Sequence, residues 1–305
     1  MSKVITVTLN PAFDIFYDTD LFEVGKENLL KTVLKTVGGK GINVSKALSA
    51  NEIDNTAVFL SPKDGGSEIC EEMFRLGIGY AAVPAEGRVR ENITVRETSG
   101  RDTRIAVNTF SASPAVLSDA LSAVSEKCED GTVIVFSGKF PKNVGREERL
   151  TFLNSLKSLS PRLVIDSSSV TAEETVAIKP WLIKPNEQEI KAFGQGDDLF
   201  GICRNVRKNG VKNILLTLGK DGAIYCGEDG EYEIKTPAVK PVSTVGAGDA
   251  TVAGFVYSTV NGFDNEKKLK YSCAFGTSAC LEEGTDAPKP ENIERFADLV
   301  SVRKI

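Results

Sequence analysis

The segment Pro241-Val-Ser-Thr-Val-Gly-Ala-Gly-Asp-Ala250 runs directly into Thr251-Val-Ala-Gly-Phe-Val-Tyr257. In the second part, Val252, Phe255 and Val256 have the spacing of one helix face. The two glycines around one alanine predict a tight turn at the N-terminus of that helix. Backbone N–H groups at such a turn are unpaired and lie at the positive end of the helix dipole, so they attract an anion. The segment therefore predicts an anion site at a helix N-terminus.

Asp249 is the unusual residue of this segment. A carboxylate beside an anion site repels the anion, unless it is there to accept a proton from a group that attacks the anion. Asp is also a common helix-capping residue, and glycine turns before helices are frequent. From this segment alone, a catalytic base and a helix cap both remain open.

The absence of histidine narrows the chemistry, because none occurs in the 305 residues. Serine–histidine and cysteine–histidine mechanisms and histidine metal sites are therefore excluded. A general base has to be Asp, Glu, Lys, Tyr or Cys. This favours Asp249 as a proton acceptor.

Composition indicates one large α/β domain over residues 1–305, since 41% of residues are hydrophobic and no biased linker divides the chain. The 37 basic and 42 acidic residues are well mixed and give a net charge of −5, which argues against nucleic acid as a partner. No apolar run is long enough to span a membrane. Six cysteines without CxxC spacing and an N-terminus without a signal peptide predict a cytoplasmic protein.

Short apolar strands alternate with helices through the middle of the chain, which is typical of buried parallel strands. We therefore predict a doubly wound, mostly parallel sheet flanked by helices, with a last helix over Glu291–Val302. Polar residues alternate with apolar ones in two further segments, about 13–36 and 88–110, and the second reads as a hairpin turning near Ser99-Gly100. These two segments are predicted to form a small β flap.

Ligands of open parallel sheets bind beyond the carboxyl ends of the strands. The loops expected to converge there are Asn10-Pro11, Ser137-Gly138, Asp166-Ser-Ser-Ser169, Lys184-Pro-Asn-Glu-Gln-Glu189 and Thr217-Leu-Gly-Lys-Asp-Gly222. Neither the Walker phosphate-binding pattern nor the dinucleotide-binding fingerprint is present.

Four ordered motifs carry a resemblance to a known family. They are Gly38-Gly-Lys-Gly-Ile-Asn-Val44, Lys184-Pro-Asn-Glu-Gln-Glu189, Leu216-Thr-Leu-Gly-Lys-Asp-Gly222 and Ser243-Thr-Val-Gly-Ala-Gly-Asp249. Over nearly its whole length, the chain resembles the PfkB (ribokinase-like) carbohydrate kinases. The resemblance implies a ribokinase-like fold and ATP-dependent phosphorylation of a sugar hydroxyl.

Two further stretches resemble the phosphosugar branch of that family, which contains 1-phosphofructokinase and tagatose-6-phosphate kinase. They are Thr6-Val-Thr-Leu-Asn-Pro-Ala-Phe-Asp14 and Arg90-Glu-Asn92. The branch implies an acceptor that already carries a phosphate, with Arg90 and Lys40 as partners of that phosphate.

The resemblance also implies roles for individual residues. Asp249 would be the general base, and the backbone N–H groups of Gly246, Ala247, Gly248 and Asp249 would form an anion hole for the transferring phosphoryl group. The implied substrate-binding residues are Asp14, Gly38, Gly39, Lys40, Asn43, Arg90, Asn92 and Ser137. The implied nucleotide-binding residues are Lys184, Asn186, Thr217, Gly219, Gly222, Thr244, Gly276 and Ser278. Asn186 and Glu189 would contribute to the shell of a magnesium ion, the second largely through water.

Two positions depart from the phosphosugar branch. Leu29 stands where those relatives usually carry an arginine, so Lys26, Lys31 or Lys40 would have to replace it if that arginine binds the phosphate. The stretch Ser137-Gly-Lys-Phe-Pro141 also differs from the usual Gly-Ser-Leu-Pro-Pro. Both departures concern the identity of the acceptor and leave the general chemistry intact.

The sequence thus predicts a kinase that uses ATP and Mg²⁺ to phosphorylate a ketohexose monophosphate, with fructose 1-phosphate as the first candidate and fructose 1,6-bisphosphate as its product. Tagatose 6-phosphate and fructose 6-phosphate are alternatives in the same class. A kinase of unphosphorylated sugars or nucleosides and an inactive sugar or nucleotide sensor also stay open. The exposed strands of the flap predict a homodimer.

Overall fold

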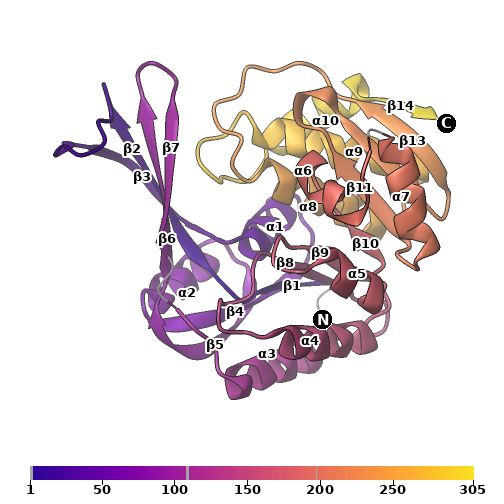
Figure 1. The fold of residues 1–305 in the computed structure, drawn as a ribbon, viewed down its shortest axis with the longest axis horizontal. Helices are drawn as coiled ribbons and strands as arrows, with labels where there is room; N and C mark the ends of the chain where they lie inside the picture. Colours follow the sequence, from indigo (N-terminus) through magenta and orange to yellow (C-terminus); the bar gives the residue numbers. More distant parts are fainter. Residues whose placement is uncertain (1–2, 108–109, 197) are drawn as a thin grey trace.

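A ten-stranded sheet runs through the computed structural model, which describes residues 3–107, 110–196 and 198–305 (Figure 1). In spatial order its strands are β14 (Ser301–Lys304), β13 (Gly230–Lys235), β12 (Ala223–Gly227), β11 (Asn213–Thr217), β10 (Leu182–Ile183), β9 (Leu163–Asp166), β8 (Val133–Ser137), β1 (Val4–Thr8), β4 (Asn55–Asp64) and β5 (Gly79–Arg88). From β11 to β5 each strand is parallel to its neighbour, whereas β12, β13 and β14 are antiparallel. The predicted mostly parallel sheet is confirmed.

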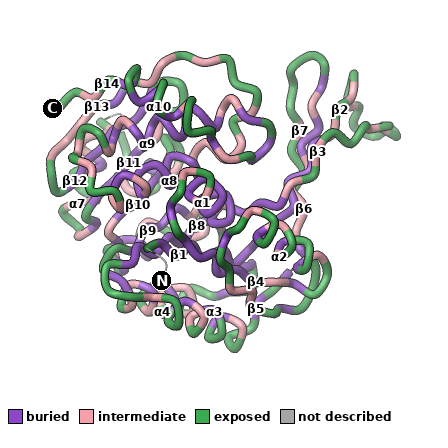
Figure 2. Tube along the Cα trace, turned by 180° about the vertical axis from the view of Figure 1, so that it is seen from behind, coloured by how far each residue is buried: buried purple, intermediate pink, exposed green. Residues whose placement is uncertain are grey.

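The central strands are apolar along their length because helices cover both faces of the sheet (Figure 2). One face is covered by α3 (Pro114–Lys127), α4 (Arg146–Leu159), α5 (Ala172–Ile178), α6 (Glu187–Ile190) and α7 (Leu199–Lys208). The other face is covered by α1 (Lys40–Ser49), α2 (Gly66–Arg75), α8 (Ala247–Val260), α9 (Asn265–Ala279) and α10 (Pro290–Leu299). Every residue of β1 is buried, as this arrangement requires.

A separate four-stranded sheet projects from the body of the molecule (Figure 1). Its order is β3 (Lys31–Gly38), β2 (Ala12–Thr19), β6 (Arg90–Glu97) and β7 (Asp102–Val107). We call this sheet the flap. It is built from the two predicted segments, although residues 108–109 at the end of the second lie outside the described residues. The assignment of residues 1–305 to a single domain stays a prediction.

Two strands are missing from the sequence prediction, and one helix end was placed wrongly. The last helix stops at Leu299 rather than Val302, and the chain continues as β14, where Val302 pairs with Ile234 of β13. Strand β5 at the opposite edge of the sheet was not predicted. Both are edge strands. Strand β14 pairs with β13, which is distant in the sequence, and strand β5 pairs with the free edge of β4. A local sequence pattern reveals neither pairing. In the described part of the chain, no helix has the length and apolar character needed to cross a membrane.

Candidate active site

One cavity of about 1170 Å³ lies between the flap and the carboxyl ends of the central strands. Its wall brings together residues that lie far apart in the sequence. The predicted residues on this wall are Asp14, Gly39, Lys40, Asn43, Arg90, Asn92, Lys184, Asn186, Thr217, Gly219, Gly222, Thr244, Gly246, Ala247, Gly248, Asp249 and Gly276. Of the strand-end loops expected to converge, loops 184–189 and 217–222 reach this wall, whereas the described loops 10–11, 137–138 and 166–169 do not line it.

The N-terminus of α8 faces this cavity. Gly246 caps the helix with φ 81°, in the left-handed region that favours glycine, and helical structure begins at Ala247. The first N–H groups of a helix have no acceptor within it. The Lys184 ammonium lies close by, because a Cβ atom added to Gly248 would stand 3.1 Å from Lys184 Nζ. Unpaired donors, the helix dipole and a cation thus act on the same point and suit a phosphoryl group.

Asp249 lies in the first turn of α8 and is 6% exposed. Burial raises the pKa of its carboxyl to about 6; repulsion from Asp166 also raises it, while Lys40 has the opposite effect. At neutral pH, the carboxylate is mostly ionised and yet basic enough to accept a proton. A general base near neutral pH needs this combination.

Asn43 connects the N-terminus of α1 to Asp249. Its side-chain Nδ2 donates a hydrogen bond to Asp249 Oδ2 at 2.8 Å. Its Oδ1 is buried and has no hydrogen-bond partner among the described residues. An unpaired buried acceptor on the cavity wall is a suitable partner for a ligand hydroxyl.

Asp14 faces the cavity from strand β2 of the flap. Its Oδ1 accepts a hydrogen bond from Asn92 Nδ2 at 2.8 Å, and Asn92 Oδ1 accepts one from Arg90 Nη1 at 2.8 Å. Burial raises the pKa of Asp14, and the hydrogen bond from Asn92 and the charge of Arg90 partly offset this. Gly38 is required here, because a Cβ atom at that position would lie 2.0 Å from Asp14 Oδ2.

Asp166 is a buried carboxylate between two cavity lysines and was not predicted as a site residue. Its Oδ1 lies 2.9 Å from Lys40 Nζ and 3.7 Å from Lys184 Nζ. Although burial acts to raise the pKa of Asp166, the two lysines outweigh it and lower the pKa. Burial likewise acts to lower the pKa of Lys40, but Asp166 and Asp249 raise it, so the ammonium stays protonated. The signal for Asp166 was its position as the last residue of a predicted strand.

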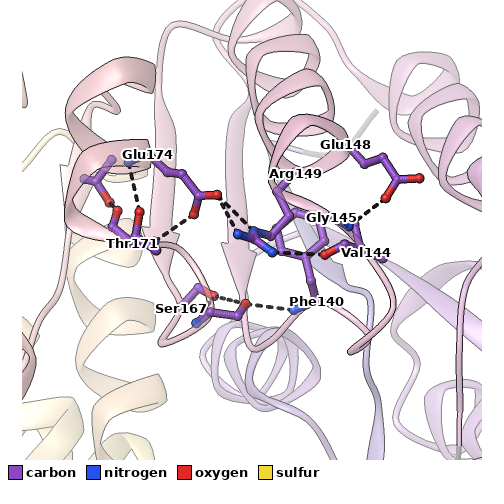
Figure 3. A network of polar contacts seen from close by, with 10 residues as sticks. Phe140, Val144, Gly145, Glu148, Arg149, Ser167, Thr171 and Glu174 are labelled. Atoms are coloured by element: carbon purple, nitrogen blue, oxygen red, sulfur yellow. Dashed lines mark hydrogen bonds and ion pairs between the residues drawn. The ribbon is translucent and has the colours of Figure 1, made fainter.

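The loops that follow β8 and β9 are tied together by a polar network (Figure 3). Arg149 on α4 pairs with Glu174 on α5 at 2.7 Å and also donates to the Val144 carbonyl at 3.0 Å. The Phe140 N–H donates to Ser169 Oγ at 2.9 Å. The network fixes the loops that leave the carboxyl ends of strands β8 and β9, after Ser137 and Asp166.

The opposite half of the cavity is formed by the turn after β11 and by α9. Thr217, Gly219 and Gly222 line it from the turn, and Gly276 lines it from the helix. Gly276 is also needed for packing, since a Cβ atom there would meet Thr251 Oγ1 of α8 at 2.3 Å. Apart from Lys220 in the turn, the residues named in this half are uncharged, as in most pockets for a nucleoside.

Four predicted residues do not lie on the cavity wall, although all four are described. Gly38 lies behind Asp14, and Ser137 is buried with its hydroxyl donating to Asp166 Oδ2 at 3.5 Å. Ser278 is fully buried and its hydroxyl has no partner among the described residues. Glu189 accepts the Asn186 N–H at 3.0 Å in the capping box of α6.

The described residues contain no group of three or more Asp, Glu, His or Cys side chains that could hold a metal ion. Asn186 Oδ1 already accepts the N–H groups of Gln188 and Glu189. A magnesium ion would fit this site when most of its ligands are phosphate oxygens and water, with few from the protein.

Three basic residues on the cavity wall were missed by the sequence prediction. Arg104 of β7, Lys139 after β8 and Lys220 after β11 all line the cavity. By contrast, Lys26 and Lys31, which were considered as replacements for the missing arginine, are not on its wall. Leu29 is 87% exposed and is also absent from the wall.

Comparison with known proteins agrees with this geometry. The model of the pfkB family carbohydrate kinases matches residues 7–292. The chain belongs to this family. It is therefore a sugar kinase, and kinases of this family use ATP.

Its relatives in the pfkB family include proteins named after phosphosugars. The 1-phosphofructokinase of Escherichia coli (strain K12) is 30% identical, with 97% of this chain and 98% of the relative covered. The tagatose-6-phosphate kinase of Staphylococcus epidermidis is 28% identical, with 99% and 100% covered. The structure of phosphofructokinase-2 from Escherichia coli in complex with substrates and products has a TM-score of 0.87 at 24% identity, covering 97% of this chain and 98% of the other. This last similarity supports the ribokinase-like fold.

Proposed function

We propose that this pfkB-family kinase transfers the γ-phosphoryl group of ATP to a hydroxyl of a ketohexose monophosphate. Fructose 1-phosphate is the first acceptor candidate, with fructose 1,6-bisphosphate as its product. The observation that carries the proposal is the position of the buried Asp249 carboxylate at the N-terminus of α8, beside Lys184 and within hydrogen-bond distance of Asn43. The relatives named 1-phosphofructokinase and tagatose-6-phosphate kinase support the class of acceptor.

In the proposed reaction, Asp249 accepts the proton of the attacking sugar hydroxyl. The N–H groups of Gly246, Ala247 and Gly248, together with Lys184, stabilise the charge on the phosphoryl group in flight. Asp14, Asn43 and Asn92 hold the hydroxyl groups of the sugar, Gly39 lets it approach the backbone, and Gly38 leaves room for the Asp14 carboxylate. The adenosine group occupies the wall formed by Thr217, Gly219, Gly222, Thr244 and Gly276.

Mg²⁺ would neutralise charge on the phosphate oxygens of ATP when bound. Asn186 on the cavity wall would contact its water shell, and Glu189 would act on it largely through water from behind Asn186. Asp166, which pairs with Lys40 and Lys184, is a further carboxylate close to these lysines. Lys40 and Lys184 keep the Asp166 carboxylate ionised, since they lower its pKa.

A coupled assay of ADP release tests the proposal across fructose 1-phosphate, tagatose 6-phosphate, fructose 6-phosphate, fructose and ribose. We expect the highest kcat/KM with one of the three sugar phosphates. A clear preference for fructose or ribose would instead support the kinase of unphosphorylated sugars. No turnover with any sugar, together with sugar or ATP binding, would support the inactive sensor.

A further inference from the structure

The basic residues on the cavity wall form two groups, those with ion-pair or hydrogen-bond partners in the protein and those without an ion-pair partner in the described structure. Lys40 and Lys184 share the Asp166 carboxylate as an ion-pair partner, and Arg90 donates to the Asn10 carbonyl at 3.1 Å and to Asn92 Oδ1. Burial lowers the pKa of Arg90, and the charge of Asp14 partly offsets this. Arg104, Lys139 and Lys220 also line the cavity, and within the described part of the chain none of them has an ion-pair partner. Arg90 likewise has no ion pair among the described residues, but its guanidinium already donates to Asn10 and Asn92. Arg104, Lys139 and Lys220 are therefore the basic side chains of the described wall that are left to bind a ligand anion.

These three residues occupy different parts of the wall. Lys220 belongs to the turn between Gly219 and Gly222, in the half of the cavity that suits adenosine. Lys139 follows Gly138, and a Cβ atom at Gly138 would lie 3.7 Å from Lys40 Cβ, which places this loop beside the reacting centre. Arg104 is on the flap, farther from both.

The strand register of the flap locates Arg104 relative to the sugar-binding residues. One row of paired residues across strands β2, β6 and β7 consists of Asp14, Asn92 and Ala106. The next row on the same face consists of Phe16, Thr94 and Arg104. Residues two apart on a strand share a face and are separated by about 7 Å. Arg104 is thus on the face of the flap that carries Asp14 and Asn92, one row nearer the flap tip.

The acceptor hydroxyl and the phosphate of a ketohexose monophosphate are at opposite ends of the carbon chain. When the hydroxyl faces Asp249 and the middle of the sugar contacts Asp14, the phosphate must lie farther along the flap. The planar guanidinium of Arg104 can donate two parallel hydrogen bonds to such a phosphate. The position of Leu29, outside the cavity wall, leaves this task to another residue.

We propose that Arg104 binds the phosphate of the acceptor and so determines the preference of this kinase for phosphorylated over unphosphorylated sugars. The inference rests on the proposed function, because it assumes a phosphosugar acceptor. It assigns the phosphate contact to β7 of the flap, since this chain carries Leu29 where an arginine would otherwise bind the phosphate.

The test compares the Arg104→Gln variant with two matched variants, Arg96→Gln and Lys139→Gln. Arg96 is in the row beyond Thr94 on the same strand, but it pairs with Asp18 at 2.9 Å and does not line the cavity. For Arg104→Gln we expect the affinity for fructose 1-phosphate, measured calorimetrically without ATP, to fall roughly 10- to 100-fold, which is the effect of losing hydrogen bonds to a charged group. The KM for ATP should stay within about twofold, whereas Arg104→Lys should recover part of the affinity because it keeps the charge but loses the planar fork.

Several results would overturn the assignment. They are unchanged phosphosugar affinity in Arg104→Gln, an equal loss in Arg96→Gln, or a loss confined to Lys139→Gln. A shift in the KM for ATP larger than the shift for the sugar would also contradict it.

Binding and turnover separate the two proposals. If the wild-type protein binds fructose 1-phosphate through Arg104 but does not phosphorylate any sugar, the proposed function fails and the Arg104 assignment stands. If it turns over a phosphosugar that Arg104→Gln binds equally well, only the Arg104 assignment fails.

Discussion

At the scale of single residues, the proposed chemistry depends most on the balance of charges around Asp249. Burial raises the pKa of this carboxyl to about 6, while Lys40 and the hydrogen bond from Asn43 act to lower it. As the proposed base, Asp249 would be active only when deprotonated. The kcat/KM of the free enzyme should therefore fall about tenfold per pH unit below pH 6 and level off above it.

Removal of the Lys40 charge should move this pH dependence in a defined direction. Because Lys40 lowers the pKa of Asp249, the Lys40→Met variant should have its half-maximal kcat/KM at a higher pH than the wild type. A pH–rate profile measures this, with Lys35→Met as the control, since Lys35 pairs with Glu68 on the surface. A midpoint that moves to lower pH in Lys40→Met would contradict the assigned electrostatics.

At the scale of elements, the ion pair between α4 and α5 holds the loops that follow strands β8 and β9 in place (Figure 3). The Glu174 side chain is fully buried and the Arg149 side chain is 19% exposed. Glu174→Ala leaves the guanidinium without its buried partner, so we expect a loss of about 3 kcal/mol in the free energy of unfolding. Glu173→Ala, at the neighbouring exposed position of the same helix, should cost no more than about 1 kcal/mol. Urea denaturation of the two variants makes the comparison, and equal losses would show that the ion pair has no special role.

The same scale shows what the sequence could and could not predict. Glycine turns and apolar strands are local signals, so the N-terminus of α8 and the alternation of the central strands with helices were predicted correctly. Strand β14 depends on the free edge of β13, which is distant in the chain. Arg104 was not predicted because its place on the cavity wall depends on the register between β6 and β7. Asp166 was not predicted because its two lysine partners come from other loops.

At the scale of the whole molecule, the flap carries apolar side chains that the single chain leaves uncovered. Val24, Leu29 and Val33, in and beside the connection between β2 and β3, are 91%, 87% and 42% exposed. Exposed apolar groups gathered in one segment favour contact with another protein surface. We therefore expect a homodimer formed through the flap, which light scattering after size-exclusion chromatography can measure.

A double variant, Leu29→Asp with Val33→Asp, should shift this dimer toward the monomer, because two charges would be placed in the contact. Leu299→Asp is a suitable control, since Leu299 is 59% exposed at the end of α10, away from the flap. A monomeric wild-type protein at micromolar concentration, or a dimer unaffected by the double variant, would contradict the flap interface.

The central claim is that Asp249 accepts the proton of the acceptor hydroxyl in phosphoryl transfer. The most direct test is the kcat of Asp249→Asn with the preferred sugar, measured beside the affinity for ATP. Because this substitution keeps the size of the side chain and removes only the proton acceptor, kcat should fall roughly 10²- to 10⁴-fold while ATP binding stays near the wild-type value. A kcat within a few-fold of the wild type would contradict the account.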